Sequence, residues 1–141
     1  MSIPSEKTDY LLLFRGTNWD KDLSPEMRQQ IVTEWYRWFE RLKQEGKCAG
    51  GHPLRDEGKV VSGKKGRTVA DGPFVESKEA VGGYFYLQVA DENEAVAIAR
   101  QCPALDYGCV VEVRPVAEMC PARARAVEDC APVEQIAGEM A

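Results

Sequence analysis

The alternation of apolar and polar residues along this chain predicts four strands of one sheet. An apolar run at residues 9–16 ends in glycine, as a buried strand does. Residues 83–90 and 108–116 alternate strictly, so each of these two strands has one aliphatic face and one mixed face. Residues 47–54 predict a further strand, although their glycines weaken the signal.

Two shorter segments predict a hairpin inserted into this series. Residues 58–63 and 66–74 are rich in β-branched residues and glycine, and residues 64–66 lie at or near the tip. The basic residues of this hairpin are Lys59, Lys64, Lys65 and Arg67. They form a solvated tip or, alternatively, a surface that docks an acidic partner.

Helical periodicity marks two further segments. A helix starts with Ser24 as its N-cap and Pro25 at its first position, and Gly46 ends it. A second helix lies within residues 91–103 and ends before Pro103; it starts with Asp91 as cap and Glu94 three residues later. The apolar face of the first helix consists of Met27, Ile31, Trp35, Trp38, Phe39 and Leu42. We expect this stripe to lie in the core.

The order of elements predicts the fold. Strand, helix, strand, hairpin insertion, strand, helix and strand form the β-α-β-β-α-β pattern of a ferredoxin-like α+β sandwich with an antiparallel sheet. Both helices must then cover one face of the sheet. The strand alternation leaves a second face bearing Tyr84, Tyr86, Gln88, Glu112 and Arg114. Such a face is a subunit interface, a ligand cleft or, in a two-fold homodimer, both.

Length and charge restrict the class of protein. The chain has 141 residues, enough for one domain at residues 1–116 and an Ala-rich appendage at 117–141 with a short helix near 132–140. A net charge of −5 argues against a nucleic-acid or membrane surface. The N-terminal residues lack the apolar core of a secretory signal, so we expect a cytoplasmic protein.

The five cysteines indicate neither a disulfide framework nor a metal site. Their number is odd and no two are spaced as C-x-x-C. The single histidine, His52, follows Cys48 by four residues, but two ligands do not make a zinc site. We expect reduced thiols, no metal and no cofactor.

The tetrapeptide Asp71-Gly72-Pro73-Phe74 has a structural and a functional interpretation. Asp71 accepts hydrogen bonds from nearby amides in a turn, and Pro73 fixes the backbone while Phe74 anchors it. Alternatively, Asp71 faces a cleft as a catalytic base or ligand contact. Arg114 likewise either forms a structural ion pair with Glu112 or is held by it to receive an anionic ligand.

Several ordered motifs give this chain a family resemblance. They are LLLFRG at residues 11–16, DGPF at 71–74, ESKE at 76–79, GGYF at 82–85 and VEVRP at 111–115. Together they resemble the DGPF branch of the YCII-related family over about residues 8–116. The resemblance implies a dimeric α+β barrel, in which the sheet of a ferredoxin-like subunit faces the sheet of its partner.

The resemblance implies less about activity. Some YCII relatives are thought to use a His on the first helix and an Asp before a Pro, but Trp35 and Cys102 stand near those positions here. Members of the DGPF branch often accompany sigma factors, which implies regulation. We therefore expect a small-molecule-binding or regulatory homodimer with a cleft between the sheets. The alternatives are an enzyme on a small, perhaps anionic substrate that uses Asp71 and Arg114, and an interaction module linked to a sigma factor.

Overall fold

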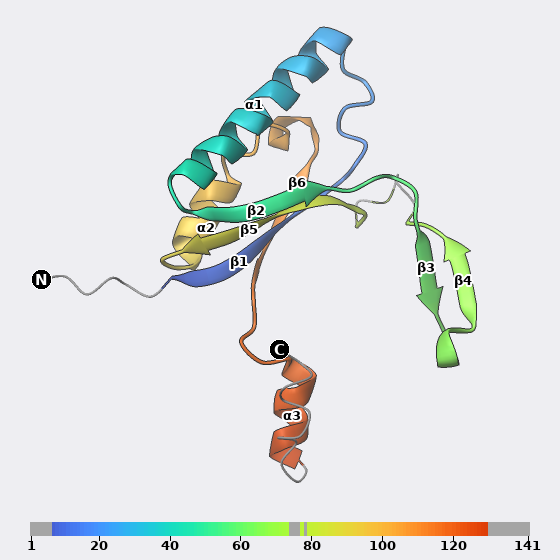
Figure 1. The fold of residues 1–141 in the computed structure, drawn as a ribbon. Helices are drawn as coiled ribbons and strands as arrows, with labels where there is room; N and C mark the ends of the chain where they lie inside the picture. The colour runs from blue at the N-terminus through green and yellow to red at the C-terminus, as the bar shows by residue number, and fades with distance from the viewer. Residues whose placement is uncertain (1–6, 74–76, 78, 130–141) are drawn as a thin grey trace, which may run out of the picture.

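A four-stranded antiparallel sheet with two helices on one face forms the body of the protein in a computed structural model, which describes residues 7–73, 77 and 79–129 (Figure 1). The strand order is β2 (Cys48–Pro53), β5 (Val81–Val89), β1 (Thr8–Arg15) and β6 (Val110–Pro115). The helices are α1 (Pro25–Gln44) and α2 (Glu92–Ala99). The predicted ferredoxin-like α+β fold is confirmed.

The register of β1 divides the sheet into two faces. Leu11 lies opposite Tyr86 on β5 and Arg114 on β6. Side chains alternate along a strand, so these residues share one face, which we call the open face. The face beneath the helices carries the buried residues Tyr10, Leu12, Phe14, Phe85, Leu87 and Val89. This assignment agrees with the faces predicted from alternation.

Capping residues fix where the helices begin. The Ser24 hydroxyl accepts a hydrogen bond from the Met27 amide at 3.2 Å. The Asp91 carboxylate accepts one from the Glu94 amide at 2.9 Å. Helix α2 ends at Ala99, three residues before the predicted end. The amides of Gln101 and Cys102 bond to carbonyls three positions earlier, which tightens the chain out of the α-helix. Within the described ranges, no helix is long and apolar enough to cross a membrane.

The aromatic stripe of α1 packs on the sheet. Trp38 is 2% exposed and its ring lies 4.9 Å from the ring of Phe85, measured between centroids. Its Nε1 donates to Gln101 Oε1 at 3.1 Å, which ties α1 to the end of α2. Trp35 and Phe39 are only partly buried, so the expectation that the whole stripe lies in the core is wrong for these two residues.

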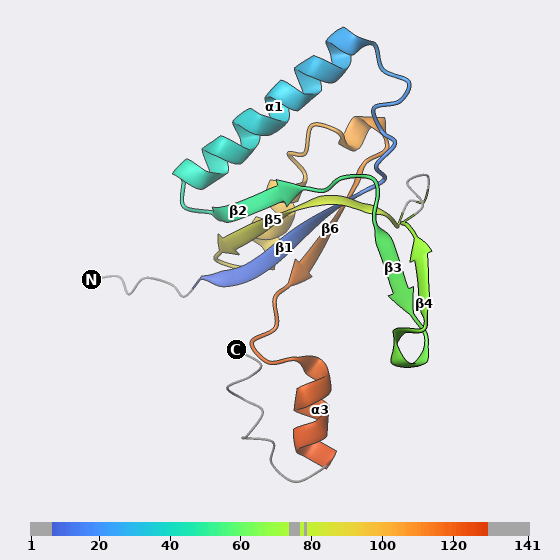
Figure 2. The same cartoon turned by 45° about the vertical axis from the view of Figure 1, so that its right-hand side comes forward.

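Two segments extend beyond this body. Strands β3 (Lys59–Ser62) and β4 (Thr68–Asp71) form the predicted hairpin, with the 3₁₀ turn η1 (Lys64–Gly66) at its tip. Figures 1 and 2 show the hairpin on the side of the sheet away from α1, where helix α3 (Pro121–Asp129) also lies. A second 3₁₀ turn, η2 (Leu105–Tyr107), precedes β6. The helix predicted near 132–140 lies outside the described residues.

The core assignment predicts a difference between two substitutions of similar size. Leu12→Ala empties a fully buried position at the centre of the sheet and should lower the free energy of unfolding by about 2–5 kcal/mol. Met27→Ala removes an exposed side chain from α1 and should change the free energy of unfolding by about 0.5 kcal/mol. Urea denaturation of both variants measures the difference, and equal losses would contradict the assignment.

Candidate functional site

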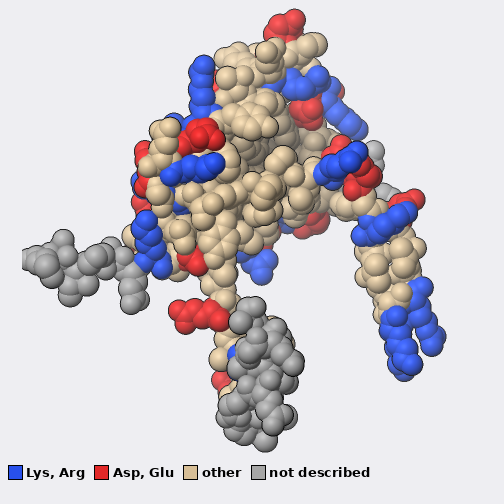
Figure 3. All heavy atoms as spheres, viewed as in Figure 1, with Lys and Arg blue, Asp and Glu red and all other residues tan. Residues whose placement is uncertain are grey.

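A pocket of about 320 Å³ opens between α1 and the end of the sheet. It lies where the β1–α1 loop passes the last residues of β2 and the first residues of β5. Its aromatic lining comes from both layers and consists of Phe14, Trp19, Trp35, Tyr36, Phe39, Tyr84 and Phe85. Figure 3 shows that the surface between α1 and the sheet carries mainly uncharged side chains.

The tryptophan rings make one wall of this pocket. Trp19, in the β1–α1 loop, stacks against Trp35 of α1 with centroids 6.0 Å apart and planes 20° apart. Phe14 of β1 meets Trp35 edge-on at 4.9 Å and 67°. Such contacts hold aromatic rings in a defined geometry, so the wall is preformed.

Glycines bring the strands beneath the pocket close together. A β-carbon at Gly51 would lie 2.3 Å from the carbonyl oxygen of Tyr84, and one at Gly83 would lie 3.0 Å from that of His52. A β-carbon at Gly82 would meet the methyl group of Thr17 at 2.9 Å. The missing side chains of these glycines therefore permit a close approach of the backbones. These positions also project no side chain into the pocket.

Polar groups gather among the exposed residues of the lining. The Nδ1 atom of His52 and the hydroxyl of Tyr84 lie 2.8 Å apart and share a hydrogen bond. Asp56, from the segment after β2, also lines the pocket and is exposed. This combination of an apolar interior and a few polar groups at the rim is typical of small-molecule sites.

The open face carries the residues that alternation predicted. The Tyr86 hydroxyl donates to the Asp9 carboxylate at 2.7 Å, and this bond, with burial, raises the pKa of Tyr86. Arg114 pairs with Glu112 at 3.1 Å, a contact that both alternatives of the sequence analysis require. Arg15 contacts the same carboxylate at 3.5 Å and links it to a second acidic residue, Glu79. The face therefore bears tyrosines and an ion-pair network.

Asp71, together with Gly72 and Pro73, lies apart from the predicted site residues of the open face. It ends β4, is exposed and pairs with Lys59 across the hairpin. The Gly72 amide donates to the Gly58 carbonyl at 3.0 Å, which closes the hairpin at its base, and Pro73 follows there. The hairpin follows β2, whereas Arg114 lies on β6 at the opposite edge of the sheet. One chain does not bring Asp71 and Arg114 together, and Phe74 lies outside the described residues.

The four described cysteines are free thiols. The buried pair Cys102 and Cys109 form a hydrogen bond, which together with burial raises the pKa of Cys109. Cys109 also lines the inner end of the pocket, as a protonated thiol at neutral pH. Among the residues that the structure describes, no three His, Cys, Asp or Glu side chains gather as a metal site would require.

The sequence analysis did not find this pocket. Its lining comes from five separate segments, and each residue of the helical stripe looks like an ordinary core residue. Two signals pointed to it: Trp19 stands in a polar loop outside any periodic segment, and glycines recur at residues 51, 82 and 83. Large aromatic residues opposite residues without side chains indicate unfilled space.

Comparisons with known proteins identify the family. The profile of the YCII-related domain matches residues 10–120, most of the chain. No curated protein matches. Among solved structures, the hydroxynitrile lyase from Passiflora edulis is similar, with a TM-score of 0.36 and 16% identity over 84% of this chain and 100% of that one. This likeness is too low to support any inference about activity. On the domain match, the chain belongs to the YCII-related family.

Proposed function

We propose that this protein binds a small, largely apolar molecule with one or two aromatic rings in the pocket beneath α1. The supporting observation is the preformed aromatic wall around an unfilled volume of about 320 Å³. An engineered apolar cavity of about 150 Å³ holds benzene, so this volume suits one or two rings. We further propose, on the DGPF motif at residues 71–74, that the chain belongs to the DGPF branch of its family, where we expect a binding or regulatory role.

The energetics favour an apolar ligand over water. The aromatic side chains of the lining offer water few hydrogen bonds, and a water molecule needs two to four polar partners. A ring stacked beside Trp35 and Phe39 would gain dispersion contacts and remove apolar surface from solvent. His52 and Tyr84 belong to the open face by register, so they would orient a polar substituent only where the pocket reaches the end of the sheet. The pocket would therefore discriminate between ligands mainly by their shape and by their apolar surface.

Binding of 2-naphthol tests the pocket directly. The chain has three tryptophans, and only Trp19 and Trp35 line the pocket. In ¹H–¹⁵N spectra, we expect 2-naphthol to shift the side-chain Nε1 resonances of these two and to leave Trp38, bonded to Gln101, nearly unchanged. Uniform shifts of all three resonances, or none at millimolar 2-naphthol, would contradict the proposal.

Substitutions at Val32 provide a matched control. Val32 lies on α1, lines the pocket and is 38% exposed, so it tolerates change. Val32→Phe fills the pocket and should weaken 2-naphthol binding by about tenfold or more, whereas Val32→Ala leaves it open and should bind about as the parent does. Calorimetric titration measures both affinities, and equal weakening by the two variants would place the ligand elsewhere.

Acid–base catalysis on the bound molecule is the second candidate function. The observation that favours it is the His52–Tyr84 hydrogen bond, because an imidazole nitrogen can take up a proton and a tyrosine hydroxyl can relay one. For any molecule that the pocket binds and converts, His52→Gln should abolish conversion and retain binding, as followed by NMR. Undiminished conversion would remove His52 from the chemistry. A site that used both Asp71 and Arg114 would need two copies of the chain.

We also propose that the open face pairs two copies of the chain. Both described helices of the sandwich, α1 and α2, cover the other face, and the open face carries partly exposed apolar and aromatic side chains. These are Leu11, Leu13, Tyr84, Tyr86 and Val110. Glu112 and Arg114 lie two residues apart on the same face of β6, so an acidic group of one copy could meet a basic group of the other under a two-fold axis.

A charge at the centre of this face should prevent pairing. Leu11 lies between Tyr86 and Arg114, so Leu11→Lys adds an unpaired charge where the sheets would meet. Sedimentation at micromolar concentration should show a parent dimer and a monomeric variant. Gln30→Lys adds the same charge to an exposed position of α1 and should remain dimeric. A monomeric parent would refute the proposed dimer.

A further inference from the structure

We propose that the β3–β4 hairpin, residues 58–72, is an arm that clasps a second copy of the chain, with Val61 and Val69 as its contact surface. This inference rests on the proposed dimer and goes beyond it, because the open face alone would suffice for pairing. It assigns a function to a segment that lies outside the sandwich and contributes nothing to its core.

The arm carries apolar residues that its own chain leaves uncovered. All eight residues of β3 and β4 are exposed. Val61 lies directly opposite Val69 in the ladder, and the two are 62% and 61% exposed. An isolated two-stranded hairpin is marginally stable in water. A partner that covered the Val61–Val69 pair would supply the apolar burial that the arm lacks.

The arm has a defined face and a closed base. Lys59 pairs with Asp71 two residues before Val61 and two after Val69, so this ion pair and the two valines share one side of the ladder. The Gly72 amide bonds to the Gly58 carbonyl where the arm joins the body. The valine pair is therefore presented in one direction by a closed ladder.

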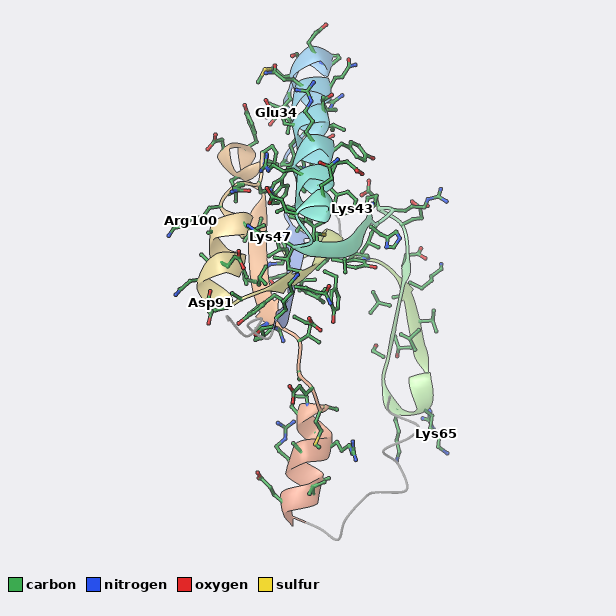
Figure 4. All side chains as sticks on the ribbon, turned by 60° about the vertical axis from the view of Figure 1, so that its left-hand side comes forward. Glu34, Lys43, Lys47, Lys65, Asp91 and Arg100 are labelled. Atoms are coloured by element: carbon green, nitrogen blue, oxygen red, sulfur yellow. The ribbon has the colours of Figure 1, made fainter. Side chains whose placement is uncertain are left out.

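Charge identifies a second copy as the occupant. Within the arm, Lys59, Lys64, Lys65 and Arg67 outnumber Asp71 by three, although the whole chain has a net charge of −5. The rest of the chain therefore carries eight net negative charges, four of them within residues 7–57 and 73–116, which hold the sandwich. Figure 3 shows the basic residues at the end of the arm, and Figure 4 shows Lys65 there, directed away from the body. A basic arm and an acidic body of another copy attract each other.

The position of the arm agrees with this occupant. Helix α1 covers one face of the sheet, and the arm extends on the side away from α1 (Figures 1 and 2). A copy paired through the open face would thus lie on the same side as the arm. Under two-fold symmetry, the arm of each copy would contact the other copy. A substitution in the arm would therefore change two contacts per dimer.

Sedimentation equilibrium of three proteins tests the clasp. Val61→Thr/Val69→Thr keeps the β-branched shape and the strand propensity but makes the contact surface polar. The dimer dissociation constant should rise by about tenfold or more, since four side chains per dimer change. Val60→Thr makes the same change on the opposite side of the same strand, where Val60 faces Ala70, and should alter it less than about threefold.

The outcomes separate this inference from the dimer itself. A dimeric parent that the double variant leaves equally tight overturns the clasp and retains pairing through the open face. A parent that stays monomeric overturns both. Equal weakening of the dimer by Val60→Thr and by the double variant also overturns the clasp, because the effect would then not depend on which side of the hairpin is changed. Circular dichroism and Trp fluorescence confirm that each variant is folded.

Carbodiimide cross-linking of mixed ¹⁴N and ¹⁵N subunits supplies a second measurement. Peptides that contain Lys64 or Lys65 should be joined to acidic peptides of the other isotope, because the arm tips reach the partner. Lys64→Glu/Lys65→Glu should lose these links. Cross-links from the tip confined to peptides of one isotope would show that the arm contacts its own chain, which overturns the inference.

Discussion

The packing of α1 across the sheet is the contact on which the other features depend. Near one end of the stripe Trp38 fills the space above Phe85 and bonds to Gln101, so the helix is fixed in position and rotation. Beside Trp38, the side chains of Trp35 and Phe39 line the pocket opposite strands that carry glycines. The same helix therefore completes the core at one point and leaves a pocket at another. A small repositioning of α1 would change the pocket before it changed the fold.

One-sided coverage of the sheet has consequences for assembly. Two helices can cover one face of four strands, and the opposite face must be solvated or paired. Here that face combines tyrosines, leucines and an ion-pair network centred on Glu112. The exposed valines of the arm present the same physical problem in a second place. A second copy of the chain would cover both surfaces, so one interaction would account for the exposed hairpin and for the exposed face of the sheet.

Sequence patterns predicted the fold and its faces well, because they depend on local rules. Ser24 and Asp91 marked the helix starts, and alternation assigned Tyr86 and Arg114 to one face. The pocket was missed because its lining joins five segments whose proximity no local rule gives. Asp71 seemed a candidate for chemistry because its motif is distinctive. The structure places it on the arm beside Lys59, a position that only the packing of the hairpin determines.

The central claim is that the space beneath α1 is a ligand site in a paired molecule. A crystal structure grown with 2-naphthol tests this most directly. We predict that the rings of 2-naphthol lie beside Trp35 and above Gly51. We also predict a second copy of the chain against the open face, with Val61 and Val69 covered. A pocket filled by the rearranged side chains of Trp19 and Phe39, with no ligand between α1 and the sheet, would contradict it.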